Sequence, residues 1–212
     1  MMSLRLAAVI LICSFSFAGV AYAASLGLSS SKLYAWGQTL TKGTCNQTST
    51  TADDTYVRQA APTSTAGGTA TTLTISPVAA AQDYAFIRFN LSGCSLSTTA
   101  GADSAVLTVR VTTAGNDTIS LFPVTSTWNS STLNWNGVSG LTIGSTATGT
   151  FSASTTGSKT VTVTADVDAA IKAGTLWGWE LKATSGTAIV AVGAVENGTS
   201  TNRPSMTLSY EK

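Results

Sequence analysis

Histidine is absent from the 212-residue chain, and charged side chains are scarce, at 10% of residues. Without histidine, catalytic triads that use imidazole as the base are excluded, and so are most transition-metal sites. The chain also has no run of lysine and arginine, which would supply the positive field that nucleic-acid binding requires. We therefore expect no nucleic-acid partner.

A long apolar run occurs near the start, at residues 6–20. It follows a segment with one positive charge and leads to Ala21-Tyr22-Ala23, and this order is typical of a secretory signal peptide. The run is shorter than the roughly 20 residues that a membrane-spanning helix needs. We therefore expect residues 1–23 to be removed, and the mature protein to be secreted or held at the cell surface without spanning a membrane.

The mature chain would be 189 residues long (212 minus 23), with ten basic residues (11 minus Arg5) and ten acidic ones. Its formal charge is therefore zero. This length is sufficient for one domain with a sizeable core, and no proline-rich linker indicates a domain boundary.

Two cysteines, Cys45 and Cys94, remain in the mature chain. Outside the cell such a pair usually oxidises, so the sequence predicts a disulfide. Closing a loop of 49 positions (94 minus 45) would stabilise the fold by about 4 kcal/mol. The alternative is a pair of buried free thiols.

Alternation of apolar and polar residues, with many β-branched side chains, dominates the rest of the chain and is typical of short antiparallel strands. The clearest segments are residues 55–59, 84–91, 105–111, 118–124, 159–167, 177–181, 188–195 and 206–210. Eight or nine strands predict an all-β fold, a jelly-roll type antiparallel β-sandwich. In this interpretation Trp177 and Trp179 belong to the core.

One short helix is expected after residue 165. Asp166 would be its N-cap, Val167, Ala170 and Ile171 would form the buried stripe, and Gly174 would follow its last turn.

Several motifs occur in order between residues 53 and 210. They are Asp54-Thr55-Tyr56-Val57-Arg58, Ala85-Phe86-Ile87-Arg88-Phe89-Asn90-Leu91, Ala105-Val106-Leu107-Thr108-Val109, residues 128–136 (WNSSTLNWN), residues 161–167 (VTVTADV), Glu196, and residues 203–208 (RPSMTL). Together they resemble the DNRLRE-domain family, jelly-roll modules of exported proteins that include alginate-binding carbohydrate-binding modules. Asn90 departs from the family pattern, in which an aspartate is expected. The resemblance implies residues 53–212 as the jelly-roll domain and leaves residues 24–52 as an N-terminal strand or extension.

Sugar binding would require aromatic or charged side chains on an outward face. By strand parity Tyr56, Arg58, Tyr84, Arg88 and Arg110 lie opposite the apolar faces of their strands. They could form one aromatic and basic patch, in which arginine forks would bind the carboxylates of acidic sugars. The alternatives are solvated strand residues with local ion pairs, or a second core face.

Calcium is the metal hypothesis, because hard cations bind carboxylate and carbonyl oxygens. Asp53, Asp54 and Glu196 are the candidate ligands of a structural Ca²⁺ ion. In the alternative, Asp53 and Asp54 form a turn before the first strand and Glu196 pairs with Arg203. The sequence requires no other cofactor.

These observations favour a secreted, non-catalytic module that binds an extracellular or cell-wall polysaccharide, with an acidic one as an option. Ten acids are present, but no two stand in a recognisable catalytic context for glycoside hydrolysis. The rival hypothesis is a structural surface or filament subunit that contacts neighbouring subunits through β-strand pairing. It is based on the low charge and the small residues of segment 24–30.

Overall fold

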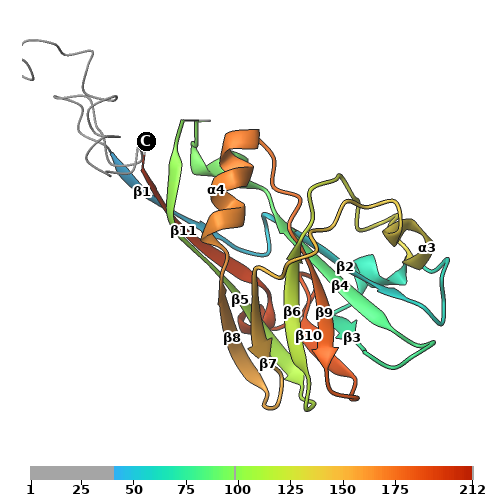
Figure 1. Ribbon diagram of the computed structural model, residues 1–212. Helices are drawn as coiled ribbons and strands as arrows, with labels where there is room; N and C mark the ends of the chain where they lie inside the picture. Colours follow the sequence, from blue (N-terminus) through green and yellow to red (C-terminus); the bar gives the residue numbers. More distant parts are fainter. Residues whose placement is uncertain (1–40, 98, 212) are drawn as a thin grey trace, which may run out of the picture. The chain divides into compact units, whose positions relative to one another are not determined.

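The structure is a computed structural model, which describes residues 41–97 and 99–211. The predicted signal peptide and segment 24–40 lie outside the described residues. In the described part most of the chain forms strands, arranged in two antiparallel sheets (Figure 1). The predicted fold class, an all-β sandwich, is confirmed.

The six-stranded sheet has the order β1-β11-β5-β10-β3, with β8 also paired to β5. Its strands are β1 (Lys42–Gln47), β3 (Thr72–Ile75), β5 (Gly101–Thr113), β8 (Gly157–Thr162), β10 (Val190–Gly193) and β11 (Ser205–Glu211). The five-stranded sheet has the order β2-β4-β9-β6-β7. Its strands are β2 (Ala52–Arg58), β4 (Asp83–Phe89), β6 (Thr118–Pro123), β7 (Gly149–Ser152) and β9 (Trp179–Ser185).

Helices in residues 41–97 and 99–211 are few and short. They are α3 (Trp135–Val138), α4 (Thr164–Ala173) and the 3₁₀ turns η2 (Ala66–Thr69), η3 (Leu91–Cys94) and η4 (Ser200–Asn202). Within the described ranges no helix has both the length and the apolar character to cross a membrane.

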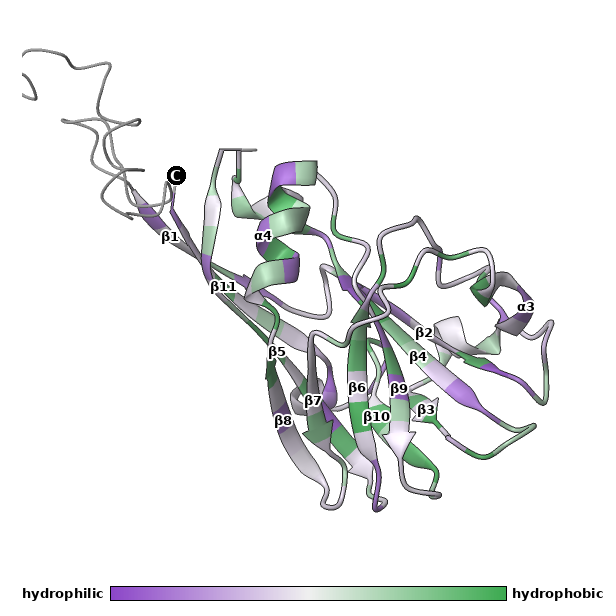
Figure 2. Ribbon diagram, viewed as in Figure 1, coloured by the Kyte–Doolittle hydropathy of each residue, from purple (hydrophilic) through white to green (hydrophobic). Residues whose placement is uncertain are grey.

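The main core lies between the two sheets and is built by the predicted alternation. In β5 the buried Ala105, Leu107, Val109 and Val111 point into it, while the residues between them are half-buried. The hydropathy colouring in Figure 2 shows apolar segments along the central strands β5, β6 and β9. Each buried leucine or valine side chain contributes about 1.5–3 kcal/mol of transfer free energy.

A second apolar cluster covers the outer face of the five-stranded sheet, the face that points away from the other sheet. Val57, Tyr84 and Phe86 of the strands pack there against Trp128 and Leu133 of the long segment after β6. The second core face considered above therefore exists at β2 and β4. Only part of this outer face is open to solvent as a result.

Helix α4 confirms its predicted stripe and its end, but not its start. Val167, Ala170 and Ile171 are buried, and Gly174 caps the helix in the left-handed region at φ 72°. The prediction of Asp166 as N-cap is wrong, because the helix begins at Thr164 and Val163 is the cap residue. Asp166 lies in the first turn, where its carboxylate accepts a hydrogen bond from Trp179 Nε1 at 2.6 Å.

The predicted disulfide is present. Cys45 of β1 and Cys94 of η3 are joined, with their Cα atoms 5.5 Å apart. The bond ties an edge strand of the six-stranded sheet to the turn that follows β4. Segment 91–97, which forms part of the site described next, is thereby anchored to the sandwich.

Candidate functional site

A groove of about 760 Å³ lies on the described surface. This size lies in the range of small-molecule binding sites. Its walls are the start of β2, the end of β4, the segment around η3, and the residues at and after the end of α4. The lining residues are Thr50, Thr51, Ala52, Asp53, Arg88, Phe89, Asn90, Leu91, Ser92, Gly93, Leu96, Ser97, Ala170, Ile171, Gly174, Thr175, Leu176 and Trp177.

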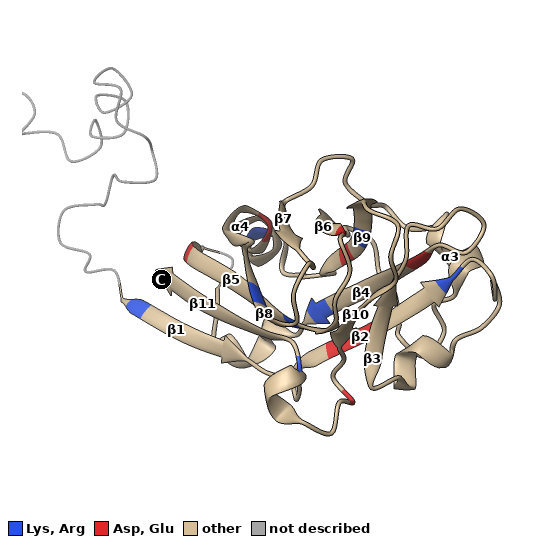
Figure 3. Ribbon diagram, turned by 90° about the horizontal axis from the view of Figure 1, so that it is seen from below, with Lys and Arg blue, Asp and Glu red and all other residues tan. Residues whose placement is uncertain are grey.

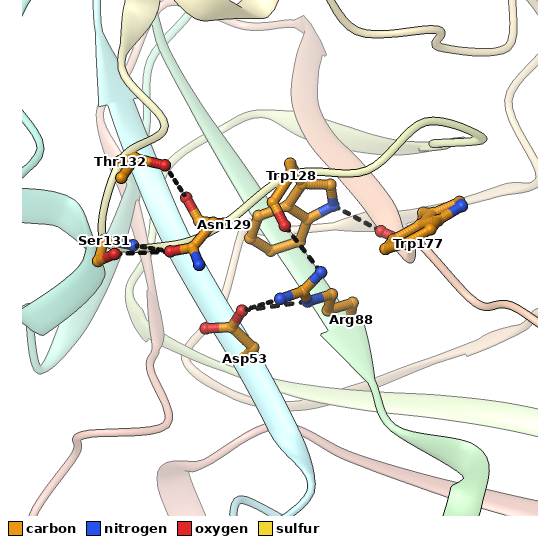
Figure 4. A network of polar contacts seen from close by, with 7 residues as sticks. All are labelled: Asp53, Arg88, Trp128, Asn129, Ser131, Thr132 and Trp177. Carbon is orange, nitrogen blue, oxygen red and sulfur yellow. Dashed lines mark hydrogen bonds and ion pairs between the residues drawn. The ribbon is translucent and has the colours of Figure 1, made fainter.

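An ion pair between Arg88 and Asp53 lies in the wall of the groove (Figure 4). The two residues are direct partners in the antiparallel ladder between β2 and β4. Arg88 donates from Nε and Nη2 to Asp53 Oδ2, at 3.0 and 2.6 Å. Both side chains are only partly exposed, at 23% and 33%. The pair neutralises both charges, and Asp53 Oδ1 makes no hydrogen bond with any described residue.

Two indole rings flank the Arg88 guanidinium. Its central carbon lies 4.8 Å from the ring centroid of Trp128 and 6.0 Å from that of Trp177, a cation–π arrangement. Arg88 Nη1 also donates to the carbonyl of Trp128 at 2.8 Å, and Trp128 Nε1 donates to the carbonyl of Trp177 at 2.6 Å. Trp128 is buried, whereas Trp177 is half-buried and borders the groove. In Figure 4 the indole nitrogen of Trp177 points away from the network.

Trp177 is half-buried against the second apolar cluster and does not belong to the main core, which corrects the sequence prediction. Trp177 and Trp179 would share a face only if the strand continued through Gly178, but β9 begins at Trp179. Gly178 has φ +81°, and an added Cβ would lie 2.0 Å from the carbonyl oxygen of Ile87. This turn sends Trp179 into the core and leaves Trp177 at the groove. A glycine between two tryptophans is the sequence signal of such a break in alternation.

The five predicted sugar-binding residues do not form one patch. Tyr56 pairs with Ala85 in the ladder, so it lies on the inner side of β2 and packs against the main core. Arg58 lies at the end of the same side, 5.4 Å from the Tyr56 ring, and forms an ion pair with Asp83 at 3.4 Å. These two side chains are therefore on the opposite side of the sheet from Arg88.

Tyr84 shares the outer face with Arg88, but its ring is covered. The Trp135 ring centroid lies 4.8 Å away, and Lys182 Nζ lies 4.6 Å from the Tyr84 centroid. The Tyr84 hydroxyl donates to Gln82 Oε1 at 2.9 Å. Tyr84 thus holds the second apolar cluster together and offers little free ring surface.

Arg110 belongs to β5 in the six-stranded sheet. Its neighbours Val109 and Val111 point into the main core, so Arg110 points to the outer face of that sheet. Whether any of the five residues contacts a sugar stays a prediction.

The candidate calcium ligands Asp53 and Asp54 lie on opposite faces of β2, and Glu196 belongs to the segment after β10. Asp53 pairs with Arg88, whereas its neighbour Asp54 is buried at 1% exposure and accepts a hydrogen bond from Val195 N at 2.8 Å. Burial raises the pKa of Asp54 to about 8, and the nearby carboxyl of Glu196 contributes to the rise. Neither alternative of the sequence analysis is observed: both aspartates lie within β2, and no ion pair between Glu196 and Arg203 occurs among the described residues.

A calcium ion would thus have Asp54 and Glu196 as carboxylate ligands, without Asp53. Across the described ranges no three His, Cys, Asp or Glu side chains are grouped as metal ligands. Asp54 Oδ1 is buried without a hydrogen-bond partner. The structural Ca²⁺ ion stays a prediction.

Comparison with protein families decides the class of the chain. The model of carbohydrate-binding module family 96 matches residues 45–210. The chain belongs to this family. The match covers both sheets and every residue of the Arg88–Asp53 network, so the groove is part of the family domain. No protein of established function matches the chain in a search of curated sequences. The membership supports the carbohydrate-binding class inferred from the sequence, a class of modules that is generally non-catalytic.

Proposed function

We propose that this protein, after export from the cell, binds a polysaccharide in the groove beside Trp177 and performs no catalysis. The observation that carries the proposal is a half-exposed indole next to a charge-neutral Arg–Asp pair in an open groove. The C–H face of a sugar ring is apolar and packs on an indole face, while a few fixed polar groups select its orientation.

Three polar groups belong to residues that line the groove and are suited to bind sugar hydroxyls. Asp53 Oδ1 is a free acceptor, and the Trp177 indole N–H is a donor without a partner in the described part of the chain. Asn90 uses its Oδ1 to accept from Ser92 N at 2.9 Å, which leaves its amide N–H₂ as a donor. Because Asp53 and Arg88 cancel each other's charge, these groups favour uncharged sugar units.

The same lining argues against hydrolysis. Asp53 is the sole carboxylate among the residues that line the groove, whereas glycosidases of the common type use two carboxyl groups that flank the scissile bond. A single carboxylate already engaged with an arginine is suited to binding.

The test is a binding titration of the full mature chain against neutral glucans, pectin and alginate. We expect Trp177→Ala to weaken binding of neutral polysaccharide about tenfold, which corresponds to about 1.4 kcal/mol. Trp177→Phe should retain most of the affinity. The backbone carbonyl that accepts from Trp128 is kept in both variants. Trp177→Ala also loses packing against the second apolar cluster, so its melting temperature is measured beside its affinity to show that the fold is retained.

Ile189→Ala is the matched control, because Ile189 is an exposed apolar residue, at 57%, that does not line the groove. Its binding should equal that of the wild type. Wild-type affinity in Trp177→Ala would refute the groove as the site, and no binding of any polysaccharide by the wild type would refute the proposed function.

The alternative function, assembly through strand pairing, stays a prediction. Segment 24–30, on which it depends, lies outside the described residues, although β1 is at the end of the strand order of its sheet.

A further inference from the structure

A second hollow, of about 220 Å³, lies on the six-stranded sheet and contains two arginines, Arg110 and Arg203. Arg110 is in the middle of β5, and Arg203 is two residues before the start of β11. The ladder pairs Ser205 with Thr108, so the antiparallel chain direction brings Arg203 to the level of Arg110. The topology therefore puts the two arginines at the same level of the sheet, and both line the hollow.

Neither arginine has a carboxylate partner in the described structure. The remaining arginines of that part of the chain, Arg58 and Arg88, each form an ion pair with an aspartate. Arg203 donates from Nε to the carbonyl of Asn197 at 2.6 Å and from Nη1 to Ser49 Oγ at 3.1 Å, both uncharged acceptors. Arg110 makes no hydrogen bond or ion pair with another described residue. The hollow thus carries an uncompensated positive charge.

The rest of the lining supplies hydroxyl groups and no acid. Ser158 of β8 is the ladder partner of Arg110, and Thr108 and Ser205 pair across β5 and β11. Two guanidinium groups in one hollow repel each other and attract a shared anion. Their planar forks are suited to carboxylate or sulfate oxygens. Surrounding hydroxyls can bind the hydroxyls of the sugar that carries the anion.

We propose that the hollow between Arg110 and Arg203 binds an anionic group of a polysaccharide, either the carboxylate of a uronate or a sulfate ester. The proposal rests on the carbohydrate-binding function proposed above and adds a second site with a different ligand chemistry. The groove beside Trp177 takes uncharged units, and the arginine hollow on the other sheet selects for charge. Figure 3 shows how few charged residues the strands carry. Few other charges are therefore present to offset the positive charge of the two arginines.

The experiment measures binding of the full mature chain to three polymers: polygalacturonate, a sulfated galactan and a neutral glucan. We expect Arg110→Gln to weaken binding of one or both acidic polymers about tenfold and to leave binding of the neutral glucan unchanged. Lys42→Gln is the matched control. It removes the same charge from an exposed side chain that is ion-paired with Asp103 and Glu211, and it should change affinity less than about twofold.

Arg203→Gln can disturb folding through its contacts with Asn197 and Ser49, so Arg110→Gln is the deciding variant. The polymer that loses affinity in Arg110→Gln identifies the anion as carboxylate or sulfate. Wild-type protein that binds only the neutral glucan would overturn this inference and keep the proposed function, whereas binding of no polymer would overturn both. Equal affinity for acidic polymers in Arg110→Gln, or for free sulfate and the polymer, would also overturn the inference.

Discussion

Arg88 and Arg110 occupy equivalent places in their strands, since each alternates with core residues and points to the outer face of its sheet. Their electrostatic states are nevertheless opposite. Arg88 has Asp53 as its direct cross-strand partner, whereas Arg110 has Ser158 on one side and the chain that carries Arg203 on the other. The comparison teaches that the ladder partner determines whether an outward arginine is a structural element or a free charge.

The same contrast distinguishes Asp53, which is paired with Arg88, from its neighbour Asp54, which has no ion-pair partner in the described structure. For Asp54 it predicts the largest effect, a change of the free energy of unfolding with pH. Burial raises the pKa of Asp54 to about 8. The unfolded chain then releases this proton at about pH 4, while the folded chain holds it to about pH 8. The free energy of unfolding therefore falls as the pH rises through this window, by several kcal/mol from this group.

Asp54→Asn should remove this pH dependence and raise the melting temperature at the alkaline end, because Asn can still accept from Val195 N. Melting curves of variant and wild type between about pH 4 and about pH 8, recorded in chelator, measure this pH dependence. Burial also raises the pKa of Asp83 and Glu180, so the relevant quantity is the difference between variant and wild type. Parallel curves would contradict the assignment. A melting temperature that is the same in calcium and in chelator would contradict the predicted Ca²⁺ site.

Loss of the disulfide distinguishes the two sites by their anchorage. Cys94 belongs to η3, whose other residues line the groove, whereas no residue of η3 lines the arginine hollow. Replacing both cysteines with alanine should lower the free energy of unfolding by about 4 kcal/mol, since it releases a loop of 49 positions. Urea titration measures this loss. Neutral-glucan binding should weaken more than binding of acidic polymers, and equal losses would contradict the difference in anchorage.

Truncation of each arginine compares their structural roles directly. Arg88→Ala removes the ion pair and the hydrogen bond to Trp128 and leaves Asp53 partly buried, so we expect a loss of about 2 kcal/mol. Arg110→Ala removes no such contact and should cost less than about 0.5 kcal/mol. Urea unfolding of both variants tests the difference. A double variant of Asp53 and Arg88 isolates the coupling between them, and a cost of Arg110→Ala equal to that of Arg88→Ala would remove the contrast.

Salt gives the smallest expected effect. Binding at an uncompensated pair of arginines is screened by ions, whereas binding beside a neutral ion pair is not. From low to high ionic strength we expect affinity for the acidic polymer to fall a few-fold and affinity for the neutral glucan to stay constant. Isothermal titration at two salt concentrations checks this, and identical salt dependence of both polymers would contradict the division of roles.

Much of the fold could be predicted from single residues and their spacing. Alternation in β5 gave its buried face, Gly174 gave the end of α4, and the two cysteines gave the disulfide. Strand β7 was not among the predicted segments, because its four residues, GTFS, are too few for a periodic signal. The start of α4 was wrong because the Asp166 carboxylate binds the distant Trp179 indole instead of the helix terminus.

The candidate site was less predictable, because it depends on contacts between residues distant in sequence. Strand parity correctly put Tyr84 and Arg88 on one face, but it could not relate β2 to β4, so Tyr56 was assigned to the same patch. Alternation assigned Trp177 to the core. The turn at Gly178 that leaves it at the groove accompanies the close approach of β4, which the sequence does not show. The charge of Arg203 is uncompensated because no described carboxylate lies beside it, and no pattern along the sequence predicts this.

The sequence by itself determined the β-rich class, the residues of the main core and the exclusion of histidine chemistry, because these depend on composition and on a period of two along each strand. Only the tertiary structure decided which charges are neutralised. Strand order and register join Asp53 to Arg88 and bring Arg110 beside Arg203. The electrostatic energy of two charged groups depends on the few ångströms between them. For residues far apart in sequence, this distance is fixed only when the sheets form.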